Sequence, residues 1–165
     1  MKYYMKQRLF SIGNDFRIFD ENNEEAFYVD GKAFTIGDHL LFQDKERNTL
    51  CEIRQKLLTF RPTYIIREPK PGNQLAKIRK ALMTFRDTFI IDVPGPNDIT
   101  VTGKWVEHEY TFKRNKKVIA TVSKKWFRQS DTYGIDIVHT GDTILVLASA
   151  VVIDIMCHKG RSNIR

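Results

Sequence analysis

The chain has 165 residues, of which 42% are hydrophobic and 28% are charged. This composition is typical of a soluble globular domain long enough to bury a core, and it excludes a largely disordered chain. No apolar run follows the charged residues 1–8, so we expect no secretory signal and an intracellular, cytoplasmic location. We predict one domain over residues 1–160 and a short C-terminal tail at 161–165.

The net charge of +7 is concentrated in the middle of the chain. Residues 67–128 contain 14 Lys and Arg against 6 Asp and Glu, whereas the remaining residues contain 13 and 14. Such asymmetry favours an anionic partner. A purely solubilising surface would produce the same pattern, and both interpretations stay open at this point.

The first quarter of the chain predicts four strands. One is expected at residues 4–12, and three short apolar runs follow at 16–19, 26–29 and 39–42, bounded by acidic or glycine-containing turns. Aromatic residues make up 12% of the chain and favour β-structure.

An internal repeat is the strongest pattern in the sequence. Residues 50–66 recur at 75–91 with ten of 17 positions identical, and a looser third copy covers 119–133. Each copy alternates apolar and polar residues and then continues into a β-branched and aromatic run, which predicts a β-hairpin. Residues 68–73 separate the first two copies and predict a turn.

The repeat also predicts which side chains face inward. A small residue recurs at one position, which implies that something bulky approaches the sheet there, and larger residues recur two and six positions later. The aligned sets are Cys51, Ala76 and Ala120; Ile53, Ile78 and Val122; and Leu57, Leu82 and Trp126. Gln55, Lys80 and Lys124 interrupt the alternation, and a β-bulge would re-aim their side chains.

Two further strands are predicted at 99–101 and 110–112. A strand at 117–120, which leads into the third copy of the repeat, follows the basic turn 113–116. The total is about twelve strands. That many antiparallel strands leave exposed edges unless the sheet curls or closes.

Residues 144–157 differ from the rest, because twelve of the 14 are apolar without period-2 alternation. We predict a helix over about 142–158, started by Thr140 to Asp142 and ended by His158, Lys159 and Gly160. The apolar run would be about 21 Å long, which is too short for a bilayer core of about 30 Å. A helix that is apolar all round must be buried all round, and the inside of the sheet is the natural place.

No enzyme motif is present, and we expect neither catalysis, nor a cofactor, nor a metal site. The four histidines are scattered, and His108 and Glu109 would point to opposite faces of a strand. Asp154 is interpreted as a buried or helix-end acid. Cys51 and Cys157 are interpreted as small buried residues, and nothing requires a disulfide between them.

The basic residues around the predicted hairpin at 113–117 and on the following strand form the candidate site, and such a cluster suits phosphate groups. Its predicted members are Lys113, Arg114, Lys116, Lys117, Lys124, Lys125 and Arg128. Lys77, Arg79 and Lys80 occupy the equivalent place in the second copy of the repeat.

Two stretches resemble a known family. They are residues 29–38 leading to 53–56 and 61–64, and residues 123–127 with 131–135 before the apolar segment. They resemble the LURP-one-related family, which is grouped with tubby C-terminal domains and phospholipid scramblases, over about residues 3–158.

The resemblance implies a mostly β protein, a twelve-stranded closed antiparallel β-barrel that encloses a central hydrophobic C-terminal helix. Because tubby domains bind phosphoinositides and scramblases act at membranes, it also implies a non-enzymatic module for anionic lipid headgroups or another phosphorylated ligand, peripheral to the membrane and without a transmembrane span. The alternative is a protein-interaction or structural barrel with no lipid role. Nucleic acid is disfavoured, since few aromatic residues interleave with the basic run.

Overall fold

The strands of the chain close into one antiparallel barrel, seen in the computed structural model that describes residues 1–7, 15–32, 36–70, 72–81, 88–125 and 132–162. Each strand pairs with its neighbours in sequence, and β1 closes the barrel by pairing with β12 as well as β2. The twelve strands are β1 (Lys2–Gln7), β2 (Phe16–Phe19), β3 (Glu25–Gly31), β4 (His39–Asp44), β5 (Thr49–Lys56), β6 (Thr63–Arg67), β7 (Gln74–Lys80), β8 (Thr88–Asp92), β9 (Ile99–Lys104), β10 (Glu109–Arg114), β11 (Lys117–Ser123) and β12 (Thr132–Ile137). The predicted fold class is confirmed.

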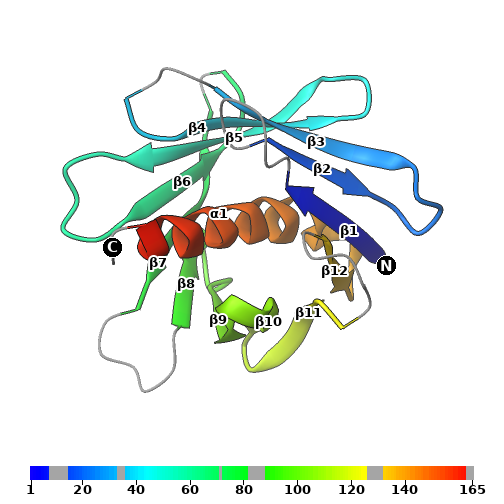
Figure 1. Cartoon of the computed structure of the whole chain (residues 1–165). Helices are drawn as coiled ribbons and strands as arrows, with labels where there is room; N and C mark the ends of the chain where they lie inside the picture. Colours follow the sequence, from blue (N-terminus) through cyan, green and yellow to red (C-terminus); the bar gives the residue numbers. More distant parts are fainter. Residues whose placement is uncertain (8–14, 33–35, 71, 82–87, 126–131, 163–165) are drawn as a thin grey trace.

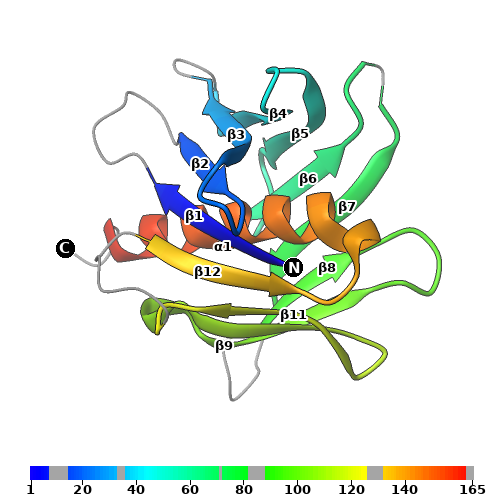
Figure 2. The ribbon, with the colours of Figure 1, turned by 90° about the vertical axis from the view of Figure 1, so that its right-hand side faces the viewer.

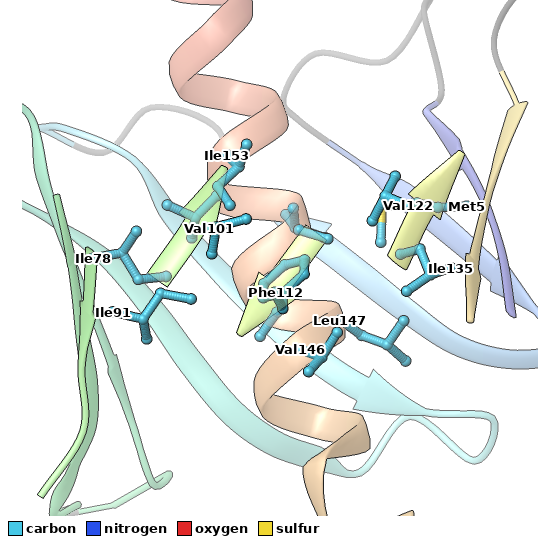
Figure 3. Packing of buried hydrophobic residues seen from close by; sticks show 14 of the residues in the cluster. Met5, Ile78, Ile91, Val101, Phe112, Val122, Ile135, Val146, Leu147 and Ile153 are labelled. Atoms are coloured by element: carbon cyan, nitrogen blue, oxygen red, sulfur yellow. The ribbon is translucent and has the colours of Figure 1, made fainter. Parts of the chain in front are cut away.

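One long helix, α1 (Thr143–Ser162), runs through the barrel between strands that lie on opposite sides of it (Figures 1 and 2). Ten consecutive residues, 146–155, are buried, so the helix has no solvent-facing stripe in this part. Its side chains pack against inward residues of the wall such as Ile78, Phe112 and Ile135 (Figure 3). Alternate side chains of each strand point into the barrel and out to solvent. The inward set covers the helix.

The helix is longer than predicted and begins and ends differently. A 3-10 turn, η2 (Thr140–Asp142), precedes it without a side-chain cap at His139, and Gly160 lies within α1 instead of ending it. Twenty residues span about 30 Å, which matches a bilayer core, so the argument from length is wrong. The stretch Thr140–His158 is long and apolar enough to cross a membrane, but 61% of it is buried inside the barrel.

The three copies of the repeat form the predicted hairpins β5–β6, β7–β8 and β11–β12. The small column is buried at Cys51, Ala76 and Ala120. Helix α1 comes closest to β5, β7 and β12 among the strands, so two of the three small residues lie on the strands nearest the helix. On the third hairpin, β12 has more extensive contact with α1 than β11, the strand that carries Ala120.

Two expectations about the repeat are wrong. Leu57 does not face inward: β5 ends at Lys56, and Leu57 is 48% exposed. The pairing of β5 with β6 runs without a shift through Gln55, and that of β7 with β8 through Lys80, so no bulge re-aims these residues. The shifts in register lie elsewhere, for example at Ile66/Arg67. The aligned Leu82 and Trp126 lie outside the described residues.

Both cysteines are free thiols. Cys51 is fully buried, and this burial raises the pKa of its thiol to about 12. It therefore stays protonated at neutral pH and acts as a small apolar wall residue.

Enlarging the small column should destabilise the barrel. We expect Ala76→Leu to lower the free energy of unfolding by about 1–3 kcal/mol, because β7 and α1 leave no room for a larger side chain. Urea denaturation followed by circular dichroism measures the change. Thr100→Leu on the exposed side of β9 is the control, with a change within about 0.5 kcal/mol. An equal effect of both variants would contradict the close approach of helix and wall.

Candidate functional site: a basic depression on the outer face of the barrel

The structure divides the described members of the predicted basic site into two groups. Lys113, Arg114, Lys116 and Lys117 lie together at the β10–β11 hairpin. Asn115 and Lys116 both have positive φ values, 48° and 64°, as a tight type I′ turn requires. Arg114 is already engaged, since its guanidinium lies 2.9 Å from the Asp142 carboxylate and holds η2, the turn before α1, against the hairpin.

The other predicted members lie at the opposite end of β11. Lys124 and Lys125 follow its last residue, Ser123, whereas the hairpin precedes its first, Lys117. A seven-residue strand separates the groups by roughly 20 Å. Glu109 also lies beside Lys124 and accepts hydrogen bonds from its backbone N–H at 3.1 Å and from Ser123 Oγ at 2.7 Å. Arg128 lies outside the described residues.

The structure gathers a different set of cations on the outer face of β5, β6 and β7. Tyr64, Ile66, Ala76 and Ile78 face the core, so the residues that alternate with them face outward. Register then aligns them: Arg54 pairs with Ile65, which pairs with Lys77. The outward cations are Arg54 and Lys56 on β5, Arg67 on β6, and Lys77 and Arg79 on β7.

Part of this face is hollowed into a shallow depression with a volume of about 310 Å³. Three cationic side chains and the Gln74 amide surround an apolar floor, which is an arrangement that offers several N–H donors to one anion. The lining residues are Arg54, Gln55, Lys56, Ile65, Arg67 and Gln74.

Two carboxylates hold the cations in place without cancelling their charge. Glu52 accepts a hydrogen bond from Arg67 at 3.1 Å and lies 3.6 Å from both Arg54 and His39. Burial alone would raise the pKa of Glu52, but the neighbouring Arg67, His39 and Arg54 outweigh it and lower the pKa below its usual value. Burial and Arg54 lower the pKa of His39, which favours its neutral form.

The Asp92 carboxylate holds two further cations on the other side of this face. It lies 3.5 Å from the Lys77 ammonium and 3.3 Å from the Arg79 guanidinium. Four of the five cations thus lie beside one of the two carboxylates, and the five together leave this face with an excess of positive charge. Residue spacing alone did not reveal the depression, because its members come from three strands whose register is set by pairing. The available signal was the repeat, which places Arg54 and Arg79 at the same outward position of two hairpins.

A second polar cluster lies inside the barrel near the C-terminal end of α1. Asp154 has a side chain only 2% exposed, and its oxygens lie 3.6 Å from His108 Nδ1 and from His158 Nδ1. His108 is the last residue of the turn that follows η1 (Trp105–Glu107), not a strand residue as predicted, and its ring stacks on Tyr133 at 4.5 Å.

The tyrosines of this cluster are strongly affected by their surroundings. Burial and the charge of Asp154 raise the pKa values of Tyr110 and Tyr133 well above the usual range. Among the residues that the structure describes, no group of three or more His, Cys, Asp and Glu could hold a metal ion. The Asp154 carboxyl group thus lies between two imidazole rings, that of His108 on the wall and that of His158 on the helix itself.

The fold and the outer face define a class: a closed antiparallel barrel around one apolar helix, with a cationic depression on its surface. The model of the LURP-one-related family matches residues 1–154, and the chain belongs to this family. It is 30% identical over 159 residues to the uncharacterized protein YxjI of Bacillus subtilis strain 168, covering 96% of this chain and 95% of YxjI. A solved Arabidopsis thaliana protein shares the fold with a TM-score of 0.70 at 14% identity, over 94% of this chain and 91% of that one.

The pair formed by His108 and Asp154 should be energetically coupled. We expect His108→Phe, which keeps a ring against Tyr133, to cost up to about 3 kcal/mol because a buried carboxylate loses a partner. Asp154→Leu in the same chain should remove most of that cost. A double-mutant cycle from urea denaturation at pH 7 should give a coupling free energy of about 1 kcal/mol or more.

His158→Phe is the control for this cycle, because His158 is 47% exposed at its side chain. Its cost should stay within about 1 kcal/mol. Additive effects of His108→Phe and Asp154→Leu would show that the pair does not stabilise the barrel.

Proposed function

We propose that this protein is a non-enzymatic binding module for anionic lipid headgroups or another phosphorylated ligand, and that the depression on β5, β6 and β7 is its site. The observation that carries the proposal is the convergence of Arg54, Lys56 and Arg67 on one hollow of about 310 Å³. A phosphate group carries several acceptor oxygens, and a set of guanidinium, ammonium and amide donors matches them.

The local charge supports an anion over a cation or a neutral ligand. Lys56 is exposed, and the side chains of Arg54 and Arg67 are 49% and 40% exposed although both face Glu52. Their donors thus remain accessible while Glu52 limits their freedom, which reduces the entropy lost when a ligand binds.

The module would act at the membrane surface as a peripheral protein on the cytoplasmic side. The burial of α1 inside the barrel supports this arrangement, since the apolar side chains of the helix already have partners in the wall. The lipid surface of the cytoplasmic leaflet is anionic, and each Lys or Arg near it contributes about 1 kcal/mol to binding.

Removing two cations from the depression should weaken binding to anionic vesicles. We expect Arg54→Gln/Lys56→Gln to bind phosphatidylcholine vesicles containing phosphatidylserine about tenfold more weakly or worse, measured by co-sedimentation. Arg67 is left unchanged because it holds the half-buried Glu52.

The matched control removes the same charge elsewhere. Lys113→Gln/Lys116→Gln lies on the β10–β11 hairpin and should change binding less than about threefold. A stronger effect at the hairpin than at the depression would move the site there. Negligible and equal binding of the unaltered protein to neutral and anionic vesicles, together with no binding of soluble inositol trisphosphate, would refute the proposal and favour a protein-interaction barrel.

A further inference from the structure

The end of the barrel next to the depression carries large apolar side chains that are exposed. Phe60 is 99% exposed, Leu58 106% and Ile36 89%, and Leu57 beside them is 48% exposed. Single exposed apolar residues are common on proteins, but four large ones together mark an interaction surface.

Two loops present these residues side by side. Leu57, Leu58 and Phe60 belong to the β5–β6 loop, which projects at the end of the barrel where α1 terminates (Figure 1). Ile36 belongs to the β3–β4 loop. The two loops touch, since Gln55 N–H donates to Asp38 O at 2.8 Å, and a Cβ placed on Gly37 would lie 2.9 Å from Leu57 Cδ2.

The β5–β6 loop is held in a defined shape. Thr59 Oγ1 donates to Arg61 O at 2.6 Å, and Arg61 Nη1 donates to Lys80 O on the next hairpin at 3.0 Å. Leu58 has a φ of 56°, a left-handed conformation that a leucine rarely adopts. The backbone is thus bent at Leu58 so that its side chain and that of Phe60 point into solvent.

Positive charge surrounds these apolar tips. Lys56 precedes Leu57 directly, Arg61 follows Phe60, and exposed Lys80 lies against Arg61. The carboxylate of Asp38 is turned toward the protein, because it accepts a hydrogen bond from the buried Tyr64 hydroxyl.

We propose that the loop tips Ile36, Leu57, Leu58 and Phe60 insert into the interfacial region of an anionic lipid bilayer while the adjacent depression holds a headgroup. This inference rests on the proposed function, and it specifies that the headgroup belongs to a lipid in a membrane. Convex, separately projecting apolar side chains with a basic collar suit a bilayer, whereas a protein partner requires a continuous face that packs at interior density.

The sequence contains a second copy of this loop. Leu82, Thr84, Phe85 and Arg86 repeat Leu57, Thr59, Phe60 and Arg61 in the next hairpin, at residues outside the described part of the chain. The proposal is built on the first copy alone.

The test removes the apolar tips without disturbing the fold. Leu58→Asn/Phe60→Ser is suitable because both side chains are fully exposed and asparagine adopts the left-handed conformation readily. We expect at least about a tenfold loss of binding to vesicles of phosphatidylcholine and phosphatidylserine, with unchanged binding of soluble inositol trisphosphate. Val118→Ser/Val138→Ser, exposed residues at the opposite end of the barrel, should bind vesicles as the unaltered protein does.

A second measurement reports insertion directly. Vesicles that contain brominated lipids should quench the tryptophan fluorescence of Phe60→Trp more strongly than that of the unaltered protein. Soluble inositol trisphosphate in place of vesicles should cause no such quenching.

Each other outcome overturns the inference in a distinguishable way. Full vesicle binding by Leu58→Asn/Phe60→Ser would refute insertion and leave the depression as a headgroup site. Binding of inositol trisphosphate without any vesicle binding would show that the ligand is a soluble phosphorylated compound and not a membrane lipid. A dimer of the unaltered protein that Leu58→Asn/Phe60→Ser converts to a monomer, seen by light scattering, would show that a second copy covers the tips.

Discussion

The structure depends on the mutual burial of one apolar helix and a closed sheet. Residues 146–155 of α1 have no polar face to present to water, so the helix requires apolar partners on every side. A twelve-stranded barrel, in turn, encloses more space than its own side chains fill, and α1 occupies that space. Neither part buries its apolar surface without the other. The strands and the C-terminal helix must therefore fold together, in one cooperative step.

This arrangement leaves the outside of the barrel free for function. Every second strand residue points outward, and those positions contribute nothing to the contact with α1. On β5, β6 and β7 they carry Arg54, Arg67 and Lys77, and the carboxylates of Glu52 and Asp92 fix the geometry of these cations. The same strands therefore supply the wall of the core on one face and a cationic surface on the other.

Loops between the same strands add a second kind of surface. The β5–β6 loop continues directly from the depression, since Lys56 lines the hollow and Leu57 begins the apolar tip. A cationic hollow and exposed apolar side chains are thus contiguous along one hairpin. The β10–β11 hairpin is also basic, but its basic residues do not line this hollow.

The sequence by itself determined the strand number, the hairpin repeat and the buried helix, because alternation, small residues such as Ala76 and an unbroken apolar run are local consequences of burial. It misplaced Leu57 and the helix end at Gly160, where strand and helix length depend on contacts far along the chain. Only the tertiary structure brought the residues of the candidate depression together. Register brings Arg54 beside Arg67 and separates Lys117 from Lys124, and pairing across strands carries no local pattern that spacing could reveal.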